Sequence, residues 1–138
     1  MSACYVDTSA VVAVLLGEPG AGAVRGALAR YSEAHSSNLL EAELRSVLAR
    51  EGIPWERASA AMTGWHWVYP DRSLGEECQR VLGKGFLHGS DLWHVACALY
   101  LAPGPGGIDF VTLDRRQAKV ASAVGLRTVG VIDLPRGR

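Results

Sequence analysis

The hydrophobic and polar positions at the start of the chain predict a strand followed by a helix. A short apolar run over residues 3–6 passes directly into an acid and two hydroxyls, Asp7-Thr8-Ser9. The segment from Ser9 to Leu16 is apolar and helical in character, and Gly17-Glu18-Pro19-Gly20 ends it with residues that interrupt helices. A carboxylate therefore stands at the junction between a buried strand and a helix.

The same alternation continues along the chain. Helical spacing of apolar residues predicts further helices, at roughly Ala21–Tyr31, Asn38–Glu51, Trp55–Trp67, Ser90–Leu101 and Arg115–Val124, with a short one beginning at the capping-box pattern Ser73-Leu74-Gly75-Glu76. The short segment Ala34–Ser36 is predicted as a strand, and so are the runs Ile108–Leu113 and Leu126–Ile132. Residues 102–107 are predicted to form a loop and residues 135–138 a loose tail. Strands that alternate with helices favour an α/β fold with a parallel sheet covered on both faces.

Composition supports one compact domain. The chain has 138 residues, of which 49% are hydrophobic, and we expect residues 1–138 to form a single domain with one core. The 14 basic and 14 acidic residues balance, so no overall positive field attracts a polyanion. Contact with nucleic acid would therefore depend on a local basic patch.

The cysteines and the N-terminus indicate a cellular compartment. Cys4, Cys78 and Cys97 form no CxxC pair and lie in apolar surroundings, which suits buried thiols in a reducing environment. The N-terminus has no basic region, and nowhere do about 18 apolar residues run together as a membrane span requires. We expect a soluble cytoplasmic protein that does not interact with membranes.

Helical phase separates two glutamates in the segment from Asn38 to Glu51. Glu43 lies four residues after Leu39 and four before Val47, inside the apolar stripe. Glu41 lies four residues before Arg45, the favourable order for a surface ion pair. A glutamate on an inward face needs a cation or a metal as a partner, so Glu43 is a functional candidate, with a buried pair with an arginine as the alternative.

Three aspartates have two interpretations each. Asp7 and Asp114 each follow a predicted strand, and Asp91 opens the helix that begins near Ser90. Each of these positions also suits an acid that caps a helix or interacts with its dipole. The carboxyl ends of parallel strands share one edge of a sheet, where ligands bind in open α/β folds. We therefore expect Asp7 and Asp114 to meet at that edge, with Asp91 and Glu43 brought in by flanking helices and with Thr8 and Ser9 taking over the capping.

Four carboxylates at one edge would repel one another unless a positive charge lies among them. Oxygen ligands without cysteine favour Mg²⁺ or Mn²⁺ over Zn²⁺. Such ions promote the hydrolysis of phosphodiesters, by lowering the pKa of a bound water and neutralising charge on the phosphate. The acids therefore indicate a site for one or two divalent ions.

Four segments carry a resemblance to a known family. They are Tyr5-Val6-Asp7-Thr8-Ser9-Ala10 with Glu18-Pro19, the region Ser37–Leu48 around Glu43, the run Ser90-Asp91-Leu92-Trp93-His94-Val95-Ala96, and Val111-Thr112-Leu113-Asp114-Arg115-Arg116. In this order and at these separations they resemble PIN-domain ribonucleases, and within that family the VapC-type toxins of bacterial toxin–antitoxin pairs. The loop from Ala102 to Gly107 is longer and richer in glycine and proline than the resemblance suggests.

The resemblance implies a three-layer α/β/α sandwich around a parallel sheet. It also implies an endoribonuclease that depends on Mg²⁺ or Mn²⁺, forms a homodimer and is inhibited by a small cognate antitoxin. Residue by residue, it assigns metal binding and catalysis to Asp7, Glu43, Asp91 and Asp114. Thr8 or Ser9 matches a hydroxyl beside the first acid and Thr112 another near the last, as supporting groups or as simple caps.

The remaining candidates each have a structural alternative. His94 lies three residues after Asp91 and would bind an acid or a phosphate, or else be a core histidine bonded to backbone. Arg115 and Arg116 would bind RNA phosphates or form a solvated face, which is the favoured interpretation for Lys119. We expect packing roles rather than base stacking for the four tryptophans, Trp55, Trp65, Trp67 and Trp93. The segment Gly83-Lys84-Gly85 lacks the rest of a phosphate-binding loop.

Two other classes of function fit part of this pattern. A PIN-like module without catalytic activity would bind RNA and not cleave it. A phosphatase or phospho-receiver domain also gathers acids at strand ends, but a haloacid-dehalogenase-type enzyme needs a second aspartate where Ser9 stands. The sequence alone therefore favours a metal-dependent nuclease.

Overall fold

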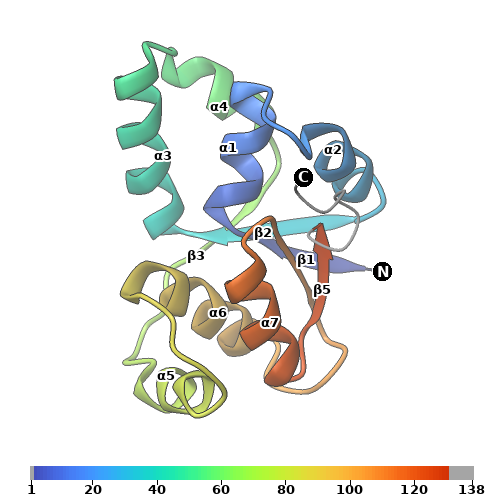
Figure 1. Ribbon diagram of the computed structural model, residues 1–138, viewed down its shortest axis with the longest axis vertical. Helices are drawn as coiled ribbons and strands as arrows, with labels where there is room; N and C mark the ends of the chain where they lie inside the picture. Colours follow the sequence, from blue (N-terminus) through green and yellow to red (C-terminus); the bar gives the residue numbers. More distant parts are fainter. Residues whose placement is uncertain (1, 131–138) are drawn as a thin grey trace.

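The computed structural model describes residues 2–130, which form a parallel sheet between two layers of helices (Figure 1). The strands are β1 (Ala3–Val6), β2 (Glu33–Ser37), β3 (His66–Val68), β4 (Asp109–Thr112) and β5 (Arg127–Gly130). The helices are α1 (Thr8–Leu16), α2 (Ala21–Leu28), α3 (Asn38–Glu51), α4 (Trp55–Ala61), α5 (Gly75–Leu82), α6 (Gly89–Leu101) and α7 (Arg115–Ala123).

All four strand pairings are parallel, in the order β3-β2-β1-β4-β5. The chain first builds outward from β1 to β2 and β3, then returns to place β4 on the other side of β1. The strand order therefore reverses between β1 and β4. In open α/β sheets such a switch point opens a crevice at the carboxyl ends of the strands, which is the usual place for a ligand.

The two faces of the sheet bury different side chains because successive residues of a strand point to opposite sides. Cys4 and Val6 pack with α1, α2, α3 and α4, whereas Tyr5 packs with α5, α6 and α7. In β4 the same division places Val111 with the first group and Phe110 with the second. Figure 1 shows the two groups of helices on opposite sides of the strands. The predicted three-layer sandwich is confirmed.

One predicted helix is wrong in its second half. The segment Trp55–Trp67 is helical only to Ala61, and His66–Val68 instead forms strand β3, which pairs with β2. Gly64 has a φ of 80°, a left-handed conformation that turns the chain out of the helix. The residues after it follow a strand's period, since Trp67 packs on the α1–α4 side of the sheet and Val68 on the α5–α7 side. Pairing with the sheet edge therefore overrides the helical spacing.

Smaller differences concern the ends of elements. Helix α2 ends at Leu28 rather than Tyr31, and β2 is longer than predicted. The capping box before α5 does not form: the Ser73 hydroxyl accepts a hydrogen bond from Gly75 N instead. The predicted last strand is present as β5, but its residues 131 and 132 and the predicted tail lie outside the described residues.

No single helix in residues 2–130 is long and apolar enough to cross a membrane. Helices α1 and α2 reach that length only together, and they are bent by 117° at the break between them.

Candidate functional site

Asp7 occupies the centre of the switch point. It follows β1 directly, its backbone N–H donates to Val111 O of β4 at 2.9 Å, and it is only 2% exposed. Its side chain also caps α1: Oδ2 accepts hydrogen bonds from the backbone N–H of Ser9 at 3.1 Å and the Ser9 hydroxyl at 2.6 Å. The expectation that Thr8 and Ser9 would take over the capping is therefore wrong, since the capping side chain is Asp7 itself.

Thr112 joins the end of β4 to Asp7. Its buried hydroxyl lies 3.0 Å from Asp7 Oδ2 and 3.2 Å from the Ser9 hydroxyl, and it accepts a hydrogen bond from Asp114 N at 3.0 Å. Ser9 adds a second link between the two segments, because its hydroxyl accepts a hydrogen bond from Leu113 N at 3.0 Å. These contacts fix the chain after β1 to the chain after β4.

Gln117 is a site residue that the sequence analysis missed. It is fully buried in α7, and its Nε2 donates to Asp7 Oδ1 at 3.3 Å and to the backbone oxygen of Asp91 at 3.1 Å. Its Oε1 lies 2.8 Å from the Thr112 hydroxyl, whose single proton is shared between this oxygen and Asp7 Oδ2. One signal was present in the sequence: Gln117 is a polar residue in the apolar stripe that continues through Val120 and Val124.

Asp114 and Asp91 lie at the N-termini of α7 and α6. Asp114 caps α7, with Oδ1 accepting from Gln117 N at 2.8 Å. Asp91 lies in the first turn of α6 and is half-buried. Burial, followed by the negative charges of Asp7 and Asp114, raises the pKa of the Asp91 carboxyl. The three aspartates therefore share one region of negative charge.

Glu43 reaches the site from α3, as its helical phase predicted. Its Oε1 accepts hydrogen bonds from the Thr8 hydroxyl at 2.7 Å and from His94 Nε2 at 2.7 Å. Partial burial raises the pKa of Glu43, but the bonds from His94 and Thr8 outweigh it and the pKa is lowered overall. Glu41 instead forms the predicted surface ion pair with Arg45, at 2.8 Å.

His94 bonds an acid and is also a core residue. It is fully buried, so it does not face a substrate, and Nε2 lies 3.1 Å from the Thr8 hydroxyl and 4.0 Å from Asp7 Oδ1. Its partner is the Glu43 carboxylate rather than backbone. The predicted alternative of a buried arginine for Glu43 is therefore wrong, because the buried partner is this histidine.

Glu43 and Tyr5 together define the proton arrangement on His94. Burial raises the pKa of Tyr5 well above its ordinary value, and its hydroxyl lies 2.6 Å from His94 Nδ1. The ionised Glu43 only accepts, so the hydrogen bond at 2.7 Å requires the proton of His94 to be on Nε2. In a neutral imidazole Nδ1 then accepts from the Tyr5 hydroxyl. The chain Tyr5–His94–Glu43 is thus directed outward from the core to the site.

The basic and aromatic candidates lie around this centre. Arg115, Arg116 and Lys119 are exposed on α7 and line one groove, described below. All four tryptophans are half-buried and pack against the two cores, Trp93 on the α5–α7 side and the others on the α1–α4 side. Packing roles for the tryptophans are confirmed. The cysteines are free thiols, also as predicted.

The donor chemistry of the site fits a hard divalent cation. The four arginine–carboxylate ion pairs in residues 2–130 involve Glu41, Glu51, Glu77 and Asp109, so none neutralises the three aspartates. Asp7 Oδ2 has three hydrogen-bond donors, whereas Oδ1 has only the 3.3 Å contact with Gln117. The carboxylates are not yet arranged as a ligand set, because no three Asp, Glu, His or Cys residues in this part of the chain are grouped to hold a metal ion.

Comparison with known families gives the class of the protein. The model of the PIN-domain family matches residues 4–123, from β1 to the end of α7. The chain therefore belongs to the PIN-domain family. Members of this family are typically nucleases, and they generally bind divalent metal ions. A search of curated proteins finds no significant match.

Proposed function

We propose that this PIN-domain protein is a Mg²⁺- or Mn²⁺-dependent endoribonuclease that hydrolyses RNA phosphodiester bonds. The observation that carries the proposal is the environment of Asp91. Its pKa is raised by burial and by the charges of Asp7 and Asp114, and no arginine or lysine among residues 2–130 forms an ion pair with these acids. A partly buried group of carboxylates without a cation is typical of a metal site.

In this proposal Asp7, Glu43, Asp91 and Asp114 hold one or two ions and are the catalytic residues. When bound, the ion supplies positive charge at the phosphate and helps to deprotonate the attacking water. The donors to Asp7 Oδ2 fix the carboxylate so that Oδ1 is the oxygen available to a ligand. Thr8 and His94 orient Glu43, while Ser9 and Thr112 orient Asp7.

We further propose that the protein is the toxin of a toxin–antitoxin pair, acts as a homodimer and is bound by a small antitoxin. This part rests on the resemblance of the four motif segments to VapC-type toxins. Three free thiols support a reducing compartment, the cytoplasm. A small antitoxin gene beside this one, whose product co-purifies with the protein, would support the assignment.

The nuclease proposal is tested by Asp7→Asn. Asparagine is also a good helix N-cap, so the variant keeps the capping bond and should fold. We expect loss of RNA cleavage in the presence of Mn²⁺, with an unchanged circular dichroism spectrum. Glu43→Gln should also lose cleavage, while Glu41→Gln on the same helix is the matched control and should cleave normally. Full activity of Asp7→Asn would overturn the proposal.

One observation favours a second function, an RNA-binding PIN-like module without catalytic activity. No three acids within residues 2–130 form a ready-made metal-binding group. Such a module would bind RNA equally with and without Mn²⁺ and leave it intact. The two functions are therefore separated by incubating the purified protein with RNA and Mn²⁺ and analysing the RNA for cleavage.

A further inference from the structure

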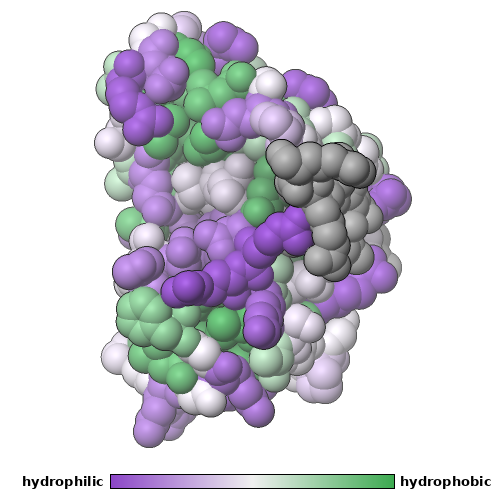
Figure 2. Space-filling model, viewed as in Figure 1, coloured by the Kyte–Doolittle hydropathy of each residue, from purple (hydrophilic) through white to green (hydrophobic). Residues whose placement is uncertain are grey.

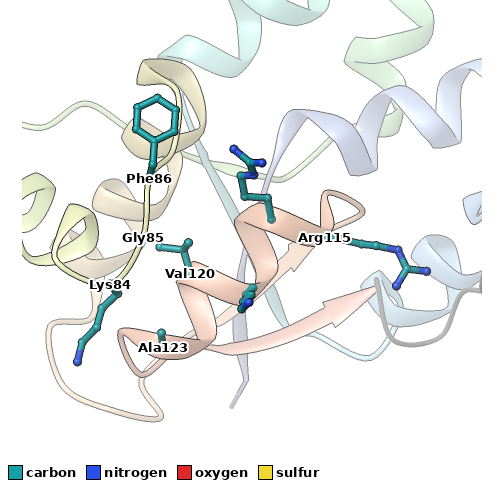
Figure 3. Close-up of a pocket in the computed structure, with 8 residues that line it drawn as sticks. Lys84, Gly85, Phe86, Arg115, Val120 and Ala123 are labelled. Atoms are coloured by element: carbon teal, nitrogen blue, oxygen red, sulfur yellow. The ribbon is translucent and has the colours of Figure 1, made fainter.

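A groove lies between α7 and the segment that leads from α5 to α6 (Figure 3). Its volume is about 570 Å³, and its lining residues are Lys84, Gly85, Phe86, Arg115, Arg116, Lys119, Val120 and Ala123. The sequence contains only two lysines, and both line this groove. In a chain with no net charge, this is a local concentration of positive charge.

The wall of the groove is built by close packing. A Cβ atom added to Gly85 would lie 2.8 Å from Val120 Cγ2, so the segment lies directly against α7. Leu87 is 3% exposed and anchors the same segment in the core. Arg80 of α5 also donates to Val124 O at the end of α7, at 3.2 Å. The spacing between the two walls is therefore fixed by these contacts, of which the approach of Gly85 to Val120 leaves no room for a larger residue.

The groove combines cations with an exposed aromatic ring. Phe86 is 61% exposed, which is unusual for a large apolar side chain. Its ring packs edge-on against the ring of His88, with 5.1 Å between the two ring centroids. In Figure 3 Phe86 and Lys84 extend in opposite directions from the segment, whereas Arg115 points away from it on the far side of α7. Figure 2 shows a hydrophilic band over this part of the molecule beside hydrophobic surface. A cation and an exposed aromatic ring thus occur two residues apart on the same wall of the groove.

Both walls lead directly to the acids of the candidate site. Phe86 precedes Asp91 by a few residues, in the segment that becomes the first turn of α6. On the other wall α7 begins at Arg115, immediately after Asp114. A polymer that lies in the groove would therefore pass close to the site that we propose for cleavage.

We propose that this groove binds single-stranded RNA next to the cleaved bond, with Lys84 and Lys119 contacting backbone phosphates and Phe86 stacking on an unpaired base. The inference rests on the proposed nuclease function and specifies how its substrate is held. Stacking on an exposed ring requires a base that is free of a duplex, which selects single strands. It also replaces the interpretation of Lys119 as part of a solvated face.

The first test measures the affinity for a short unstructured RNA by fluorescence anisotropy, in EDTA so that no cleavage occurs. Loss of a stacked base costs about 1–3 kcal/mol, so Phe86→Ala should weaken binding by about 5-fold or more. Phe86→Trp should bind as well as the native protein. Tyr69→Ala is the matched control, because Tyr69 is 66% exposed and lies outside the groove, and it should have no effect.

The second test measures the salt dependence of the same binding. Each phosphate contact to a single strand contributes about 0.7 to the slope of log K against log salt, so Lys84→Ala/Lys119→Ala should lower the slope by about 1.4. Phe86→Ala should leave the slope unchanged. The control Arg50→Ala/Arg57→Ala removes two exposed cations from α3 and α4, away from the groove, and should leave both slope and affinity unchanged.

Unchanged affinity in both Phe86→Ala and the double lysine variant would overturn the inference and leave the groove as a surface for an acidic protein segment. Equal binding of duplex and single-stranded RNA would also overturn it. The proposed function fails by a different result, the absence of cleavage by a native protein that binds RNA. The two failures are therefore distinguishable.

Discussion

The two oxygens of Asp7 have different surroundings, and this difference gives the residue two tasks. Oδ2 accepts from Ser9 N, the Ser9 hydroxyl and the Thr112 hydroxyl, which caps α1 and ties it to β4. Oδ1 has the single long contact with Gln117 Nε2. Capping and ligand binding, which the sequence presents as alternatives, are therefore compatible in one carboxylate.

At the residue scale, Gln117→Ala tests the buried amide that links Asp7, Thr112 and Asp91. The substitution leaves buried hydrogen-bonding groups without their partner, so we expect the free energy of unfolding to fall by about 1–3 kcal/mol. Urea denaturation measures the change. Gln79→Ala, on the exposed face of α5, is the control and should be close to neutral. Equal stability of the two variants would show that the buried hydrogen bonds of Gln117 do not contribute to the free energy of unfolding.

Asp91 provides a pH-dependent prediction for the metal-free protein. Because its pKa is raised in the folded state, the unfolded chain loses this proton first as pH rises, and the folded state is then destabilised. Asp91→Asn should therefore raise the free energy of unfolding near neutral pH. The gain should disappear at about pH 3, below the ordinary pKa of aspartate, where the carboxyl is neutral in both states. A pH-independent difference in urea denaturation, measured in EDTA, would contradict this account.

At the scale of elements, helix α3 was predicted with its correct bounds, and helical phase correctly separated Glu43 from Glu41. Strand β3 was missed, because three residues at a sheet edge carry too short a pattern to outweigh the helical spacing before them. Gln117 was missed for another reason. The sequence indicates a buried polar residue in α7, but its partners Asp7 and Asp91 come from distant segments that only the fold brings together.

The packing of the α5–α6 segment on α7 is tested by Gly85→Ala. The added methyl group would lie 2.8 Å from the stiff, branched side chain of Val120, so the segment must move. We expect a loss of about 1–3 kcal/mol in the free energy of unfolding, as is usual for overpacking. The control is Gly89→Ala in α6, where a Cβ meets no atom within 4 Å. If both variants have the stability of the native protein, the close approach does not exist in solution.

At the scale of the whole molecule, the site depends on the reversal of strand order between β1 and β4. Asp7 and Asp114 follow these two strands, and helices from opposite layers, α3 and α6, bring Glu43 and Asp91 to them. The alternation of strands and helices predicted from the sequence that the acids share one edge of a parallel sheet, but the strand order that makes β1 and β4 neighbours came from the structure. The hydrogen bonds that orient the acids join distant segments of the chain and could be identified only from the three-dimensional structure.

A ligand that binds only the folded state raises its stability, and this gives a test of metal binding that is independent of activity. We expect millimolar Mn²⁺ to raise the melting temperature of the native protein and EDTA to reverse the rise. In Asp7→Asn the rise should be much smaller. Glu41→Gln should respond like the native protein. A rise of the same size in all three proteins would indicate binding elsewhere.

The pairing of β1 with β4 also determines when, during synthesis of the chain, the site around Asp7 can assemble. Val6 of β1 pairs with Val111 of β4, so β1 cannot complete its pairing until β4 has been synthesised. A nascent chain on the ribosome can form β1, β2 and β3 early, but Asp7 acquires its Thr112 and Gln117 partners only when the last quarter of the chain has emerged. Chains released before that point lack an assembled site, whatever acids they carry.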